Sequence, residues 1–245
     1  MASEESLVAE LLPRLIKASA LTFGTYTLKS GRISPYFVNS AQLFTSSLLG
    51  TLARAYAAIL ASPPFSLSEG TEEAGAAAGG KSKPSFDILF GPAYKGIPLC
   101  AIAARELDFH GPAYEGVAYS FNRKEAKDHG EGGTIVGASL KGKRVVVLDD
   151  VITAGTALRE AISIIQNQGG VVVGVVVLMT RQERVSDSEP RSAMKVAEDE
   201  LGVPIRAVLK FEDIIKAIED GRIKDASPEQ LQQMKAYRDK YRSRD

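Results

Sequence analysis

The chain has 245 residues, 44% of them hydrophobic, which is enough to build one packed domain of ordinary size. Thirty basic residues balance thirty acidic ones, so the zero formal net charge gives no argument for binding nucleic acid or a membrane surface. The single cysteine, Cys100, excludes an intrachain disulfide, and its apolar neighbours in IPLCAIAA indicate a small core residue.

The N-terminal segment MASEESLVAELL begins with acidic residues and continues with the pattern of an amphipathic helix. It lacks the basic start and the apolar run of a secretory signal. The longest strongly apolar stretch, Val171–Met179, is far shorter than the ~18 residues that a membrane span needs. We therefore expect a soluble, cytoplasmic protein that makes no use of a membrane.

One segment, Ser62–Ser85, departs from the composition of the rest of the chain. It is rich in Gly, Ala, Ser and Pro and contains one aromatic residue. Such a composition buries little surface. We expect an exposed, mobile insertion without a role in chemistry, set into a single domain that spans residues 1–245.

After this segment, apolar runs that predict strands alternate with patterns that predict helices. The predicted strands are Phe86–Pro92, Gly116–Phe121, Lys143–Val151, Val171–Thr180 and, as a candidate, Pro204–Phe211. The predicted helices are Ile97–Leu107 and Gly155–Gly170, and the polar segment Asn122–Gly133 is predicted to be a glycine-ended loop. Strands that are apolar throughout, with helices between them, predict an α/β fold with a parallel sheet covered on both faces.

Three unusual sequences follow the first three predicted strands: GPAYKG, RKEAKDH and DDVITAGT. Ligands of open parallel sheets bind beyond the carboxyl ends of the strands. These three sequences are therefore expected to meet at one binding site.

The last of these sequences places Asp149 and Asp150 at the end of an apolar strand, before a turn of small residues and a helix. Such a turn lets backbone N–H groups approach an anion, and the helix N-terminus favours negative charge. Acceptors for sugar hydroxyls beside a phosphate cradle would make a ribose-phosphate site. The acid pair and the turn alone fit equally well an ordinary strand-to-helix turn, and neither a Walker lysine nor a GxGxxG turn is present.

The stretch DDVITAGTA resembles the phosphoribosyl-pyrophosphate signature of the type I phosphoribosyltransferases. Four further motifs stand in the order seen in orotate phosphoribosyltransferases: FGTYTLKSGRISPYF, FGPAYKGIP, FNRKEAKDHGEGG and TRQE. The resemblance runs from about Leu7 to the C-terminal helix and is interrupted by the insertion. It implies a parallel sheet flanked by helices, with a small hood subdomain built by residues 1–45.

The resemblance also implies the reaction. Orotate would attack phosphoribosyl pyrophosphate (PRPP), giving orotidine 5′-monophosphate and pyrophosphate in pyrimidine biosynthesis. The implied cofactor is Mg²⁺, held mainly through substrate oxygens and water and not directly by the protein. The implied assembly is a two-fold homodimer in which the lid loop of one chain reaches the site of the other.

The resemblance assigns roles to particular residues. Asp149 and Asp150 would bind the ribose hydroxyls, and Lys127, assisted by His129, would stabilise the departing pyrophosphate from the lid. The implied PRPP-binding residues are Lys29, Tyr94, Lys95, Arg123, Lys124, Lys127, His129, Asp149, Asp150, Val151, Ile152, Thr153, Ala154, Gly155, Thr156 and Ala157. The implied orotate-binding residues are Lys29, Tyr36, Phe37, Thr153 and Arg181.

Two other functions share parts of this pattern. A repressor that only senses PRPP would carry a DNA-binding module, and the chain shows no basic recognition helix. A transferase for another base, such as a purine, would not call for Arg181 and the pair Tyr36-Phe37. The resemblance makes one further prediction, a cis peptide bond between Ala93 and Tyr94.

Overall fold

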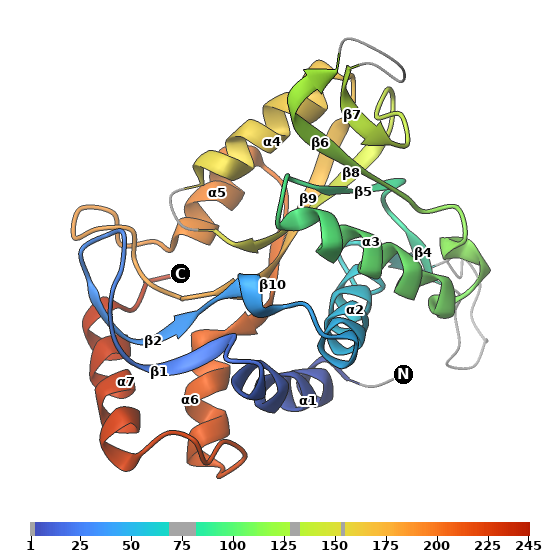
Figure 1. The fold of residues 1–245 in the computed structure, drawn as a ribbon. Coiled ribbons are helices and arrows are strands. Elements are labelled where there is room, and N and C mark those ends of the chain that lie inside the picture. The colour runs from blue at the N-terminus through green and yellow to red at the C-terminus, as the bar shows by residue number, and fades with distance from the viewer. Residues whose placement is uncertain (1–2, 69–81, 128–132, 153–154) are drawn as a thin grey trace, which may run out of the picture.

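A six-stranded sheet forms the centre of the molecule (Figure 1), with the strand order β10-β9-β8-β5-β6-β7. The computed structural model describes residues 3–68, 82–127, 133–152 and 155–245. The strands of the sheet are β5 (Ile88–Gly91), β6 (Ala118–Lys127), β7 (Gly133–Gly137), β8 (Arg144–Val151), β9 (Val171–Thr180) and β10 (Ile205–Lys210). Neighbouring strands from β10 to β6 are parallel, and only β7 pairs antiparallel at the edge.

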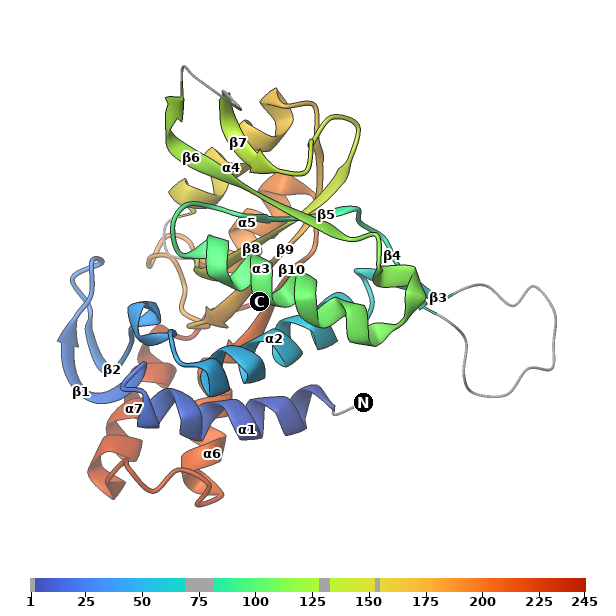
Figure 2. The same cartoon turned by 45° about the vertical axis from the view of Figure 1, so that its right-hand side comes forward.

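Helices cover both faces of this sheet, as predicted (Figures 1 and 2). The helices are α1 (Glu4–Lys17), α2 (Ser46–Leu60), α3 (Gly96–Leu107), α4 (Thr156–Asn167), α5 (Ala193–Leu201), α6 (Phe211–Glu219) and α7 (Pro228–Tyr241). Apolar residues of α4 and α5 build one core with the sheet, and α1, α2, α3 and α6 build the other. Cys100 is fully buried in the second core, as expected for a small apolar residue.

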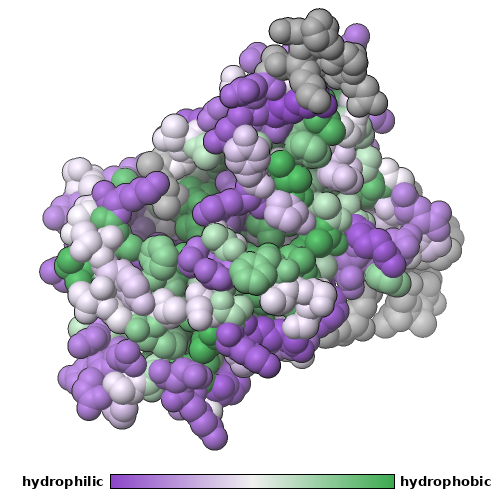
Figure 3. Space-filling model, viewed as in Figure 1, coloured by the Kyte–Doolittle hydropathy of each residue, from purple (hydrophilic) through white to green (hydrophobic). Residues whose placement is uncertain are grey.

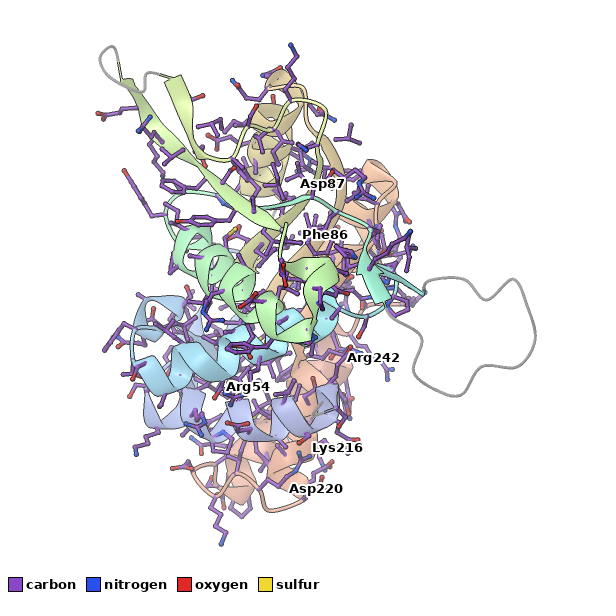
Figure 4. All side chains as sticks on the ribbon, turned by 90° about the vertical axis from the view of Figure 1, so that its right-hand side faces the viewer. Arg54, Phe86, Asp87, Lys216, Asp220 and Arg242 are labelled. Atoms are coloured by element: carbon purple, nitrogen blue, oxygen red, sulfur yellow. The ribbon has the colours of Figure 1, made fainter. Side chains whose placement is uncertain are left out.

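A hairpin of β1 (Leu21–Thr27) and β2 (Ile33–Val38) projects from the body, and α7 packs against β2. Figure 2 shows the hairpin and α7 together at one end of the molecule. Unlike the hairpin, helix α1 does not project but lies against the body. Arg54 of α2 and Lys216 of α6, labelled in Figure 4 on either side of α1, pair with Glu10 at 2.6 Å and with Glu5 at 3.2 Å.

The two ends of the segment Ser62–Ser85 are ordered and partly buried, so the prediction of an exposed insertion is wrong for Phe65 and Ser66, although Leu67 is exposed. Short strands β3 (Ser66–Ser68) and β4 (Ser82–Pro84) pair antiparallel, and Phe65 is fully buried. The Phe65 ring lies directly on Gly174 of β9, where a Cβ atom would overlap it. The low apolar content of the segment suggested that none of it packs on the body, but its one aromatic residue does. Residues 69–81, the centre of the predicted insertion, lie outside the described residues.

Replacing residues 69–81 with a two-residue Asn-Gly turn should leave turnover unchanged, because β3 and β4 already pair as a hairpin up to Ser68 and Ser82. Loop closure changes by only roughly 0.6 kcal/mol per doubling of length, so the melting temperature should shift by no more than a few degrees. Phe65→Ala is the contrasting variant, since losing a buried phenylalanine costs about 3–5 kcal/mol. A large loss of turnover in the loop replacement would contradict the prediction.

Among the described residues, no helix is both long enough and apolar enough to cross a membrane.

Candidate active site

The three unusual sequences meet at one edge of the sheet. Strands β8, β5 and β6 are neighbours and parallel, so their carboxyl ends lie side by side. The acid pair ends β8, the sequence GPAYKG leads from β5 into α3, and the sequence RKEAKDH begins within β6. The expected convergence is therefore observed for the residues that the structure describes.

The Asp150 side chain accepts hydrogen bonds from two other side chains at this edge. Its Oδ2 atom accepts a hydrogen bond from Ser40 Oγ at 2.5 Å and one from Lys95 Nζ at 3.0 Å. Burial raises the pKa of this carboxyl, but the hydrogen bonds from Ser40 and Lys95 outweigh it and leave the pKa below its usual range. Asp150 is thus held ionised, with a cation beside it from the loop that follows β5.

Asp149 has a different environment from its neighbour. Its Oδ1 atom accepts the backbone N–H of Asp150 at 2.9 Å, and Tyr56 Oη donates to its backbone carbonyl at 3.0 Å. Burial raises the pKa of Asp149 to about 6, and the negative charge of Asp150 adds to the rise. The two adjacent carboxyls therefore titrate apart, although they occupy consecutive positions of one strand.

The backbone of the loop after β5 passes very close to the start of α3. A Cβ atom on Gly91 would overlap the Gly96 carbonyl oxygen, and one on Gly96 would lie 2.7 Å from the carbonyl oxygen of Leu148. Between these glycines the peptide from Ala93 to Tyr94 is cis, as predicted. The N–H of Ala93 donates to Asn122 Oδ1 at 2.9 Å. Asn122 is buried, so β6 holds this loop from the side.

The predicted loop Asn122–Gly133 is in part a strand, which corrects the prediction. Strand β6 continues through Lys127, and β7 returns antiparallel from Gly133. The polar composition indicated a loop, but backbone pairing with a non-local partner determined the structure. Figure 3 shows hydrophilic residues gathered over this hairpin. The Lys124 Nζ atom lies 5.3 Å from the centre of the Tyr94 ring.

The predicted lid residues are only partly described. Arg123 Nη1 donates to the Gly133 carbonyl at 3.3 Å, across the hairpin. The backbone of Lys127 belongs to β6, and His129 lies outside the described residues.

Helix α4 begins at Thr156, directly beyond the end of β8. Gly155 precedes it with φ at +73°, a conformation that favours glycine. Val151 is the last residue of β8, Ile152 follows it, and Ala157 lies in the first turn of α4. Thr153 and Ala154, predicted to bind the phosphate, lie outside the described residues. The helix N-terminus thus points to this edge of the sheet, as a phosphate cradle requires.

Arg181 follows β9, one strand away from the acid pair, and contacts the hairpin. Its guanidinium carbon lies 4.3 Å from the centre of the Tyr36 ring, and Nη2 donates to Ser34 Oγ at 2.8 Å. Tyr36 is fully buried, stacked on Phe211 at 4.5 Å between ring centres. Phe37 is 40% exposed. Of the two predicted aromatic residues, only Phe37 presents a ring to solvent.

The predicted base-binding residue Lys29 lies in the turn between β1 and β2, where it is exposed. The turn is closed by two hydrogen bonds: the Leu28 N–H donates to the Arg32 carbonyl, and the Gly31 N–H donates to the Leu28 carbonyl. Lys29 therefore sits at the far end of the hairpin from Phe37.

Comparison with known proteins places this geometry in a family. The model of the phosphoribosyl transferase domain matches residues 75–200. An orotate phosphoribosyltransferase of Coccidioides immitis is 50% identical over 245 residues, which cover 98% of each chain. An orotate phosphoribosyltransferase of Neurospora crassa is 44% identical and aligns over the whole of both chains. This chain belongs to the orotate phosphoribosyltransferases.

A solved structure supports the same assignment for the fold. The crystal structure of an orotate phosphoribosyltransferase from Francisella tularensis superposes with a TM-score of 0.74 and 34% identity. It covers 96% of this chain and all of the other. The type I phosphoribosyltransferase fold predicted from the motifs is therefore confirmed.

Three contacts at this edge involve residues that the motifs did not single out. Ser40 follows the hairpin and reaches Asp150, Asn122 holds the loop at Ala93, and Glu183 pairs with Arg181 at 2.7 Å. Asn122 and Glu183 stand inside the quoted motifs FNRKEAKDHGEGG and TRQE, so their position there was a usable signal. Ser40 carried no such signal, because its contact with β8 is long-range.

The unequal titration of the acid pair leads to a pH prediction for this enzyme. Below about pH 6 the Asp149 carboxyl is protonated and loses the charge on which its predicted contact with the ribose hydroxyls depends. We expect kcat/KM for PRPP to fall as the pH decreases through this value. The Asp149→Asn variant lacks the titrating carboxyl, whereas the ionisation of PRPP affects the assays of both enzymes equally. The ratio of wild-type to variant kcat/KM should therefore decrease on acidification, and a pH-independent ratio would contradict the assignment.

Proposed function

We propose that this chain transfers the 5-phosphoribosyl group from PRPP to orotate, through the residues that meet at the carboxyl edge of the sheet. The products are orotidine 5′-monophosphate and pyrophosphate, a step in the synthesis of UMP. The observation that carries the site assignment is the contact of Lys95 with Asp150 at 3.0 Å. It joins a cation suited to pyrophosphate to a carboxylate suited to ribose, beside the N-terminus of α4.

As pyrophosphate leaves, the ribose ring becomes positively charged and the leaving group carries negative charge. The enzyme must stabilise both charges. Asp149 and Asp150 hold the ribose hydroxyls, and their charge stabilises the cation-like anomeric carbon. Lys95 turns from Asp150 toward the pyrophosphate as substrate enters, and Lys127 neutralises the same leaving group from the lid. Ser40 keeps its hydrogen bond to Asp150, so the carboxylate stays in place when Lys95 leaves.

Orotate is a planar anion, and a guanidinium recognises such a group with paired N–H donors. Arg181 supplies these paired donors. Of the two aromatic residues predicted to contact the base, Phe37 supplies the exposed ring. The buried Tyr36 ring packs against the Arg181 guanidinium and does not contact the base. Lys29 approaches the substrates only with movement of the hairpin turn.

The donor set of the site is suited to Mg²⁺ carried with the substrate. Asp149 and Asp150 offer hard oxygen donors, and the described residues contain no group of three or more His, Cys, Asp or Glu side chains that could hold a metal ion. Mg²⁺ would be held by pyrophosphate and ribose oxygens with water between it and the acid pair. When bound, it would neutralise part of the pyrophosphate charge.

The direct test is consumption of orotate in the presence of PRPP and Mg²⁺, followed by the loss of orotate absorbance. Hypoxanthine in place of orotate is the control for a purine transferase. We expect orotate to be consumed and hypoxanthine to remain. Consumption of hypoxanthine, or PRPP binding without any transfer, would favour one of the two other functions.

Arg181→Lys should raise the Michaelis constant for orotate more than that for PRPP. A planar fork is replaced by a point charge that cannot bind a planar anion through two parallel hydrogen bonds. Both constants are measured by initial rates with the second substrate saturating. Equal effects on the two constants would remove Arg181 from the orotate site.

A further inference from the structure

Glu183 is a largely buried carboxylate with three polar partners from three parts of the chain. Its Oε1 atom accepts hydrogen bonds from Arg181 Nε at 2.7 Å and from Tyr237 Oη at 3.0 Å. Its Oε2 atom pairs with Arg32 Nη1 at 3.0 Å. The Glu183 side chain is only 11% exposed, so water competes little for these contacts.

The three partners come from the end of β9, from the hairpin and from α7. Arg32 also donates to the backbone carbonyls of Arg184 and Val185, at 2.8 and 3.2 Å. Its guanidinium carbon lies 4.7 Å from the centre of the Tyr241 ring on α7. Glu183 therefore lies where the segment carrying Arg181, the hairpin and the last helix join.

These contacts determine how Arg181 is oriented. A free arginine samples many rotamers, and binding a ligand would have to order them. Here Nε is held by Glu183, Nη2 is held by Ser34, and the guanidinium lies over the Tyr36 ring. A guanidinium has five N–H donors, so further donors stay available for a planar acceptor in one defined plane.

We propose that Glu183 is a positioning residue for base recognition, which fixes the plane of the Arg181 guanidinium before orotate binds. Tyr237 holds the carboxylate from α7, and this makes the last helix part of the machinery that selects the base. The proposal rests on the proposed role of Arg181 in binding orotate. It assigns Glu183 no contact with either substrate.

A purely structural ion pair would behave differently. It would lower the melting temperature when broken, and any loss of activity would fall on both substrates alike. A positioning residue for Arg181 instead affects the orotate Michaelis constant selectively. Hydrogen bonds to charged groups correspond to roughly tenfold to hundredfold in a binding constant.

The experiment compares Glu183→Ala, Glu183→Gln and Tyr237→Phe in the full-length enzyme. Glu183→Ala is expected to raise the orotate Michaelis constant by about tenfold or more, with that for PRPP within about twofold. Glu183→Gln keeps an acceptor oxygen for Arg181 Nε without the charge, so it should recover part of the loss. Tyr237→Phe keeps the ring and removes the hydroxyl group, which hydrogen-bonds with both Glu183 and Arg181, and it should show a smaller change of the same kind.

Glu189→Ala is the matched control. Glu189 lies in the same segment and pairs with Arg191 at 2.6 Å, but neither residue contacts Arg181 in the described contacts. Its variant should leave both Michaelis constants unchanged. The melting temperatures of all variants show whether they fold. If Glu183→Ala does not fold, Glu183→Gln, which keeps the size of the side chain, takes its place in the test.

The outcomes separate this proposal from the one on which it rests. If Arg181→Lys raises the orotate constant but the Glu183 variants do not, the positioning role is overturned and the orotate site stands. Equal changes for both substrates in the Glu183 variants likewise overturn it. If Arg181→Lys has no selective effect, the assignment of the orotate site itself is wrong.

Discussion

A mixture of the Lys127→Ala and Asp150→Asn variants should recover about a quarter of wild-type activity, although each variant alone is nearly inactive. Removing one preorganised charged group typically costs on the order of 10²–10³ in rate. Asp150 is held within the body of the chain by Ser40 and Lys95, whereas Lys127 is the last residue of β6. We propose that this lid completes the site of a neighbouring subunit.

The recovery follows from the symmetry of a two-fold dimer. Random exchange makes about half of the dimers mixed, and each mixed dimer then has one site with both defects and one intact site. If the lid served its own chain, every site would keep one defect and no activity would return. Exchange is confirmed independently by mixing chains that carry two different fluorescent labels.

A mixture of Asp149→Asn with Asp150→Asn is the matched control. Both substitutions affect the same end of β8, so no intact site can form by exchange in this mixture. Activity that returned here would come from some other effect of mixing. Absence of recovery in the first mixture, with exchange demonstrated, would contradict the shared site.

Gly91→Ala should both destabilise the fold and abolish most of the activity. The added Cβ atom would overlap the backbone of Gly96 and lie 2.9 Å from Cys100 Cβ. Backbone atoms cannot rotate away as a flexible side chain can, so β5 and α3 must separate. Overpacking of this kind costs typically about 1–3 kcal/mol, and each kcal/mol lowers the melting temperature by about 2–4 °C in a domain of this size.

The loss of activity has a separate cause. Lys95 immediately precedes α3, and its contact with Asp150 depends on how closely the start of the helix approaches β8. Moving the helix outward would take the Lys95 ammonium away from Asp150 and from the pyrophosphate that we propose it binds.

Gly116→Ala is the control for the glycine substitution. No atom lies within 4 Å of a Cβ built on Gly116, and its φ is not in the left-handed region. This variant should keep its melting temperature and its rate. A Gly91→Ala enzyme as stable and active as this control would show that the close approach is not required.

Three of the motifs that define the candidate site, GPAYKG, DDVITAGT and TRQE, could be located from the sequence because each stands at a strand end that local composition reveals. The run VVVLDD is apolar until the acids, and buried parallel strands have this pattern because both of their faces are covered. The same logic placed GPAYKG after β5 and TRQE after β9. Parallel strands align their carboxyl ends, so these sequences had to meet once the order β9-β8-β5-β6 formed.

Other features depend on contacts between residues far apart in the chain. Residues 122–127 are polar and indicated a loop, but backbone hydrogen bonds to β7 make them part of a strand. Phe65 stood in a segment of low apolar content, and only the space over Gly174 decided that it is buried. Tyr36 and Phe37 are adjacent aromatic residues, and the pleat of β2 buries one and leaves the other exposed.

The amino-acid sequence alone therefore determined the family, the sheet and the strand ends at which the acids, Lys95 and Arg181 stand, because these are set by local hydrophobic pattern and short motifs. Only the tertiary structure decided which groups support them. Ser40 reaches Asp150 across 110 positions, and Tyr237 reaches Glu183 across 54. Such contacts leave no periodic trace in the sequence, because they are made by the packing of the hairpin and α7 against the body.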